Sequence, residues 1–121
     1  LADWRAWHAA GMDVGSHTRT HANLTELPAA AAREEITLSK QELEQAIGCE
    51  VRHFCYPYGH FTAEHAAMAR EAGYATATTT QRGRNAAGAN PYTLRRIMVA
   101  RATNPLQFFM KVATGYEDRR A

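Results

Sequence analysis

The order of β-forming and helical segments along the chain constrains its fold more than any other feature of the sequence. Short runs rich in β-forming residues are found at 12–14, 51–56, 74–80 and 94–99. Stretches with helical periodicity or helix-capping residues lie at 4–10, 28–47, 62–72 and 105–114. Strands that alternate with helices indicate βα units, so we predict an α/β fold with a parallel sheet or barrel.

Residues with terminal preferences mark the ends of the predicted helices. The clearest helix, 28–47, has Pro28 suited to its first turn and Gly48 suited to its stop. Thr62 and Asn104 are suited to cap the N-termini of the two later helices.

Two tryptophans and two cysteines are assigned to packing. We interpret Trp4 and Trp7, on the first predicted helix, as core anchors rather than as a platform for a sugar. Cys49 and Cys55 do not form a CxxC pattern and lack a His at zinc-finger spacing. We therefore expect small, buried or half-buried free thiols, and the redox compartment is not readable from them.

The length and the net charge of the chain limit the number of domains and the kinds of partner that it can have. The 121 residues suit one domain, and no repeat divides them. The net charge of +2 comes from scattered basic residues, which gives no footprint for nucleic acid. No apolar run approaches the roughly 18–20 residues of a membrane span. Because the chain starts at Leu1 without an initiating Met, we expect residues 1–121 to be a single partial domain cut from a longer protein.

The strongest candidate for chemistry is the pair His17 and His21 in the run GSHTRTH. Imidazoles four residues apart on a helix share a face and can reach one metal ion. The spacing alone is weak, because about 0.3 such pairs are expected by chance from six His. An incidental pair of histidines therefore remains an alternative on spacing alone.

The context of the pair favours the metal interpretation. The pair follows the predicted strand 12–14 and the Gly15-Ser16 turn, and a Tyr-Pro-Tyr-Gly loop follows the next predicted strand. Functional groups of parallel sheets and βα barrels gather at the C-terminal ends of the strands. Both motifs are thus expected at the same end of the fold.

Three ordered segments resemble the polysaccharide deacetylase family, the NodB-homology group of carbohydrate esterases (carbohydrate esterase family 4). They are GMDVGSHTRTHANL (11–24), FCYPYG (54–59) and LRRIMV (94–99). The resemblance covers nearly the whole chain. It implies a partial, distorted (β/α) barrel of the NodB-homology type that lacks its N-terminal strands.

The resemblance also implies a divalent metal, most often zinc, held by two His and one Asp. His17 and His21 match the two His ligands. A zinc ion with an open fourth position lowers the pKa of its water towards about 7. Thr18 matches a residue expected to make an orienting hydrogen bond near the ligands, with a role as a helix N-cap as the alternative.

In the same way, the resemblance assigns roles to the Tyr-Pro-Tyr-Gly loop. The backbone amide of Tyr58 matches a donor to the oxyanion. Tyr56, Pro57, Tyr58 and His60 are expected to contact substrate along a sugar groove. A Pro-Gly turn with two packing tyrosines is the alternative.

The chain departs from the family pattern in three places. The Asp-Asp motif that supplies the base and the third ligand is absent, and of Asp3, Asp13 and Asp118 none has its setting. We therefore expect that ligand upstream of Leu1. Cys55 occupies the position where the family pattern leads us to expect an Arg. Arg96 is therefore the candidate to orient the base, and a surface salt bridge of Arg96 is the alternative. A late Leu-x-His motif is also missing, because no His follows His65.

Together these features predict a metal-dependent deacetylase that hydrolyses N-acetyl or O-acetyl groups of a polysaccharide such as peptidoglycan or an exopolysaccharide. The fragment alone is expected to be inactive. Two alternatives remain open: a glycan-binding pseudoenzyme of the same fold, and a hydrolase of C–N bonds in small amides. The family resemblance implies an extracytoplasmic or cell-envelope location, which the fragment itself does not reveal.

Overall fold

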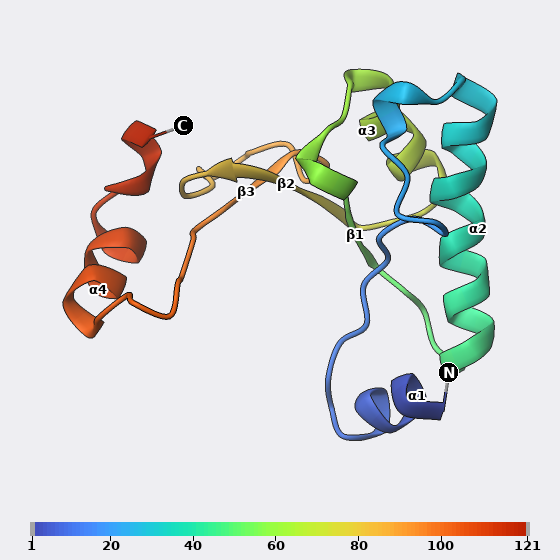
Figure 1. Cartoon of the computed structure of the whole chain (residues 1–121), viewed down its shortest axis with the longest axis horizontal. Coiled ribbons are helices and arrows are strands. Elements are labelled where there is room, and N and C mark those ends of the chain that lie inside the picture. Colours follow the sequence, from blue (N-terminus) through green and yellow to red (C-terminus); the bar gives the residue numbers. More distant parts are fainter. Residues whose placement is uncertain (1, 121) are drawn as a thin grey trace.

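The computed structural model describes residues 2–120, and it places the side chains of residues 3–118. Its centre is a parallel sheet of order β1-β2-β3, built from β1 (His53–Cys55), β2 (Thr76–Arg82) and β3 (Leu94–Arg96) (Figure 1). The helices are α1 (Ala2–Ala9), α2 (Ala29–Ile47), α3 (Ala63–Glu71) and α4 (Pro105–Ala113). Short 3₁₀ turns are η1 (Leu24–Glu26), η2 (Pro57–Gly59) and η3 (Glu117–Arg120). The predicted α/β class with parallel strands is confirmed.

Three of the predicted helix termini are confirmed by their capping geometry. Helix α2 ends at Gly48, whose φ of 76° is left-handed and whose amide donates to the Glu44 carbonyl at 2.9 Å. Thr62 caps α3, and Asn104 caps α4 by accepting from the Gln107 amide at 2.8 Å. Capping depends on neighbours within four residues, which explains why the sequence alone located these ends.

Two strands are shorter than predicted and one is displaced. Strand β1 covers 53–55 of the expected 51–56, and β3 covers 94–96 of the expected 94–99. Strand β2 has the predicted seven residues but lies two positions later than expected. The strand expected at 12–14 does not form. Pairing begins instead at Ser16, expected to be in a turn, which makes an isolated bridge with Phe54. Residues 74–75 lead out of α3, since the Tyr74 amide donates to the Ala69 carbonyl at 3.2 Å. At the other end, β3 stops at Arg96, which pairs with the last residue of β2.

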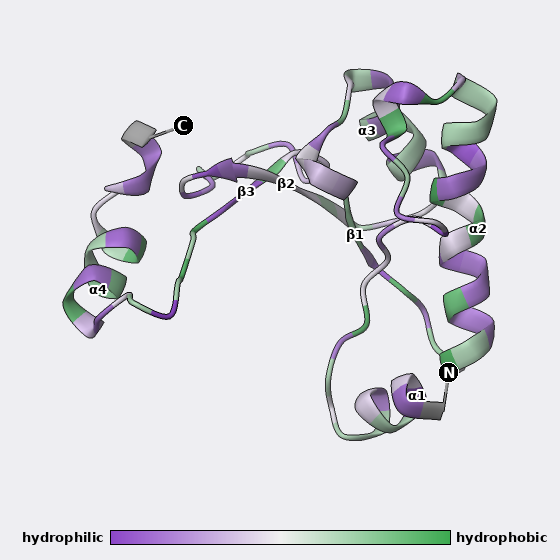
Figure 2. Ribbon diagram, viewed as in Figure 1, coloured by the Kyte–Doolittle hydropathy of each residue, from purple (hydrophilic) through white to green (hydrophobic). Residues whose placement is uncertain are grey.

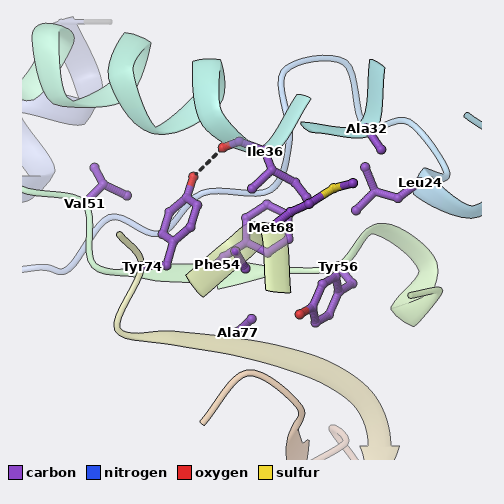
Figure 3. Packing of buried hydrophobic residues seen from close by; sticks show 10 residues of the cluster. Leu24, Ala32, Ile36, Val51, Phe54, Tyr56, Met68, Tyr74 and Ala77 are labelled. Carbon is purple, nitrogen blue, oxygen red and sulfur yellow. Dashed lines mark hydrogen bonds between the residues drawn. The ribbon is translucent and has the colours of Figure 1, made fainter. Parts of the chain in front are cut away.

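A compact core fills the space between the sheet and the pair α2 and α3 (Figure 3). Ile36, Phe54 and Tyr74 are among its largest buried side chains. The Tyr74 hydroxyl donates to the Ile36 carbonyl at 3.0 Å, and burial raises the pKa of Tyr74. Its polar end is therefore satisfied inside the core.

Two expectations about packing have opposite outcomes. Cys49 and Cys55 are free and half-buried, as predicted. Trp4 and Trp7, in contrast, are 45% and 63% exposed, so the interpretation of these residues as core anchors is wrong. The physical reason is the place of α1 against the end of α2, where the Arg5 side chain rather than an indole reaches the Ala46 carbonyl.

Helix α4 lies apart from the core and has no buried residue (Figures 1 and 2). Its exposed apolar side chains are Leu106, Phe108, Phe109, Met110 and Val112. Within residues 2–120, no helix has both the length and the apolar character needed to cross a membrane.

Candidate metal centre

His17 and His21 lie in a loop directly after the Ser16 bridge, at the C-terminal side of the sheet. The loop is not helical, because Thr18 and His21 adopt left-handed φ values of 66° and 57°. The two rings nevertheless meet edge to face, with centroids 4.8 Å apart. The four-residue spacing therefore brings the imidazoles together through two unusual backbone conformations rather than through a helical turn.

One imidazole has a defined tautomer. The Nδ1 atom of His17 lies 2.7 Å from the Cys55 carbonyl oxygen. A carbonyl only accepts hydrogen bonds, so Nδ1 carries the proton and donates it, which leaves Nε2 with a free lone pair. Second hydrogen bonds of this kind orient the histidines of metal sites.

Tyr58 extends the exposed cluster around the histidines. Its ring meets that of His21 at 4.8 Å between centroids, and the His60 ring lies 6.0 Å from it. Tyr58 is 59% exposed and has a φ of 60°. A left-handed tyrosine is uncommon, and the cost of such a conformation is of order 1–3 kcal/mol.

Tyr56 and Pro57 do not line this surface, which corrects the expectation that they contact substrate. Tyr56 is 2% exposed, its ring stacks on Phe61, and its hydroxyl donates to the Tyr92 carbonyl at 2.7 Å. Burial raises the pKa of Tyr56 well above its ordinary value. Pro57 is buried as well. Only Tyr58 and His60 of this expected group present their rings to solvent.

Arg96 reaches the histidines' end of the sheet. From the end of β3, its Nη2 atom donates to the Cys55 thiol at 2.9 Å, across the intervening strand β2. Cys55 is the same residue whose carbonyl accepts from His17. The surface salt bridge considered as the alternative does not occur among the residues that the structure describes.

Thr18 does not make the hydrogen bond expected of it, nor does it cap a helix. Its hydroxyl is buried and has no hydrogen-bond partner within the described part of the chain. Thr18 has a left-handed φ of 66°, so it does not have the extended backbone of a helix N-cap.

Glu35 on α2 makes the contacts with the histidine loop that sequence reasoning missed. Its carboxylate accepts from the Arg19 amide at 2.8 Å, the Thr20 amide at 3.0 Å and the Thr20 hydroxyl at 2.8 Å. Burial raises the pKa of Glu35, but the hydrogen bonds from Thr20 and Arg19 outweigh it, so its pKa is lowered and the group is charged near neutral pH. No local spacing signals a contact between residues 15 and 16 positions apart.

The residues present fit half of a metal site. The exposed pair supplies two imidazoles, and the hydrogen bond at His17 leaves its Nε2 available as a ligand. Across residues 2–120, no group of three or more His, Cys, Asp or Glu side chains gathers as metal ligands would. Asp13 and the other aspartates therefore do not complete the site.

Comparisons with known proteins identify a family and similar folds. A family model described as polysaccharide deacetylase matches residues 2–77. No curated protein matches the chain.

Three solved structures illustrate the likeness. The Streptococcus pyogenes deacetylase PplD, solved with acetate, has a TM-score of 0.86 at 21% identity, covering 91% of this chain and 49% of its own. A polysaccharide deacetylase from Bacillus cereus has a TM-score of 0.80 at 26% identity, covering 91% of this chain and 35% of its own. A CE4 family pseudoenzyme from Bacillus anthracis has a TM-score of 0.58 at 27% identity, covering 61% of this chain and 26% of its own. The chain thus spans half or less of the length of each of these structures.

Proposed function

The chain belongs to the polysaccharide deacetylase family, and we propose that it contributes the two histidine ligands of a metal-dependent deacetylase. Its α/β fold is part of a NodB-homology domain. The observation that carries the proposal is the exposed pair of His17 and His21, with the His17 tautomer set by the Cys55 carbonyl. The third ligand is proposed to be an aspartate of the longer protein, upstream of Leu1.

The ligand set suits zinc as the metal. When bound, a zinc ion supplies Lewis acidity and lowers the pKa of water enough for attack on an acetyl carbonyl near neutral pH. The residues of this chain hold and orient that ion. His17 and His21 are its ligands, and the Cys55 carbonyl keeps the His17 ring in the tautomer that binds it.

The loop after β1 is proposed to stabilise the oxyanion through the backbone amide of Tyr58. The neighbouring amides of Gly59 and His60 are used within the loop, since they donate to the Tyr56 and Pro57 carbonyls at 2.9 and 3.1 Å. These bonds fix the turn on both sides of the Tyr58 peptide. A fixed amide aimed at developing negative charge lowers a barrier by roughly 2.7–4 kcal/mol.

Two exposed rings and one guanidinium complete the proposed site. The ring of Tyr58 lies against His21, and His60 lies beside it, so sugar units can contact both. Arg96 holds a positive charge at the end of β1, where it would orient a carboxylate base. We propose an acetylated polysaccharide, such as peptidoglycan or an exopolysaccharide, as substrate, and an extracytoplasmic or envelope location follows from such a substrate.

A comparison of two tyrosine variants tests which ring contacts sugar. Tyr56→Phe in the full-length protein is expected to cost about 1 kcal/mol of stability, because the Tyr92 carbonyl loses its donor. Its KM for acetylated oligomers should stay unchanged. Tyr58→Ala keeps the backbone amide and is expected to raise KM with little loss of stability. Urea denaturation measures the change in stability, and acetate-release kinetics measure the change in KM. If only Tyr56→Phe raised KM, Tyr56 rather than Tyr58 would be the tyrosine that contacts the sugar.

A glycan-binding pseudoenzyme is the second candidate function. It is favoured by Cys55 at the position where the family resemblance leads us to expect an arginine, and by the lack of a histidine after His65. A relative in the same family is described as a pseudoenzyme. Arg96 argues against this alternative, because its guanidinium lies beside the Cys55 thiol.

Acetate release by the full-length protein separates the candidates. We expect a stoichiometric divalent metal and acetate release from N- or O-acetylated oligosaccharides, lost on treatment with a chelator and restored by zinc. Binding of the oligomers without acetate release, measured by calorimetry, would establish the pseudoenzyme. Release from small amides but not from oligomers would establish the small-amide hydrolase.

A further inference from the structure

One face of α2 holds the segment that carries the histidines. Glu35, Ser39 and Glu42 are spaced four and three residues apart, so they share a face of the helix. Ser39 bonds the Ser16 hydroxyl at 2.7 Å, directly before His17. Glu42 pairs with the Arg19 guanidinium at 2.8 Å, and Glu35 accepts from the peptides between the two histidines.

The contacts of this face differ in strength. The Arg19–Glu42 pair is exposed, with 41% and 54% of the side chains accessible, so it contributes little to the stability of the loop. Ser39 bonds Ser16, the residue before the loop, rather than the loop itself. Glu35 accepts three hydrogen bonds from the loop. Hydrogen bonds to an ionised carboxylate are roughly twice as strong as those between neutral groups.

The loop needs such an anchor because its backbone is strained. Thr18 and His21 are both left-handed, and each such residue costs roughly 1–2 kcal/mol. The bonds to Glu35 lie between these two positions, at Arg19 and Thr20. Without them, relaxation of either backbone would turn one imidazole away from the other.

We propose that Glu35 is a positioning residue, which holds the 17–21 loop so that both imidazoles face one metal ion. The inference rests on the metal site proposed above. It assigns to α2 a role beyond packing against the sheet. A bound metal is expected to gain from this arrangement because the two ligands are already in place before it arrives.

The test is the affinity of the full-length protein for Zn²⁺, measured by competition with a chromophoric chelator. Glu35→Ala is expected to weaken binding about 10- to 100-fold, as for other residues that orient metal ligands. Glu35→Gln keeps a carbonyl oxygen for the two amides but loses the charge, so its affinity should lie between that of Glu35→Ala and that of the wild type. Glu42→Gln, on the same face but in an exposed pair, is the matched control and should bind as the wild type does.

Melting of the metal-free variants separates positioning from stability. Equal Zn²⁺ affinity for Glu35→Ala and wild type would overturn the inference. So would a loss of affinity in Glu35→Ala that only follows a loss of folded protein, or a Glu35→Gln variant as weak as Glu35→Ala. If the wild type binds no Zn²⁺, the proposed function fails, and the inference fails with it. If the wild type binds Zn²⁺ and Glu35→Ala binds it equally well, only the inference about Glu35 fails.

Discussion

His17→Ala and His21→Ala in the full-length protein are each expected to remove the bound metal and acetate release together. Each change leaves a single imidazole where two rings now lie 4.8 Å apart. Changing a residue that merely orients a ligand costs about 10- to 100-fold in metal affinity or activity, so removal of a ligand should cost more than about 100-fold. Metal content by atomic absorption and acetate release by a coupled assay measure the two effects in parallel.

A histidine away from the site supplies the control. His53 begins β1, and its Nδ1 atom is paired with the Thr76 hydroxyl at 2.8 Å. His53→Ala should therefore retain metal and activity within the range of ordinary surface changes. Full retention of metal in His17→Ala or His21→Ala would show that the changed residue is not a ligand, whatever happens to acetate release.

The sequence predicted the helices well because their signals are local. Gly48, Thr62 and Asn104 act on groups within a few residues, so their effect is the same in the sequence and in the fold. Strand bounds were predicted less well, because a strand forms only where a partner accompanies it. That information lies in the pairing of residues such as Ser16 with Phe54, 38 positions later.

The candidate site likewise has features that the sequence reveals and features that depend on the fold. The histidine pair and the Tyr58 turn could be found from motifs, although their left-handed backbones could not. The burial of Tyr56 had a readable signal, since side chains alternate along a strand and Tyr56 therefore shares the inner face with Phe54. Glu35 had none, because its bonds to the loop depend on how α2 lies against it.

The second large effect is expected at Gly59, which closes the turn after Tyr58. Gly59 has a φ of 71°, and a Cβ atom there would lie 1.9 Å from the Thr80 hydroxyl oxygen of β2. A left-handed alanine costs roughly 1–2 kcal/mol, and overpacking of this kind adds typically 1–3 kcal/mol. Gly59→Ala should therefore lower the free energy of unfolding by about 2–5 kcal/mol. Urea denaturation of the full-length protein measures it.

Gly48→Ala is the matched control, because it isolates the backbone cost from the steric one. Gly48 has a nearly equal φ of 76°, but a Cβ atom there would meet nothing within 4 Å. It should cost only the roughly 1–2 kcal/mol of the conformation and leave acetate release intact. Gly59→Ala should cost more and also reduce kcat, since moving the turn moves the Tyr58 amide. Equal losses of stability in the two variants would mean that the turn moves away from Thr80 at no energetic cost. A turn that moves so easily could not hold the Tyr58 amide in a fixed position for an oxyanion.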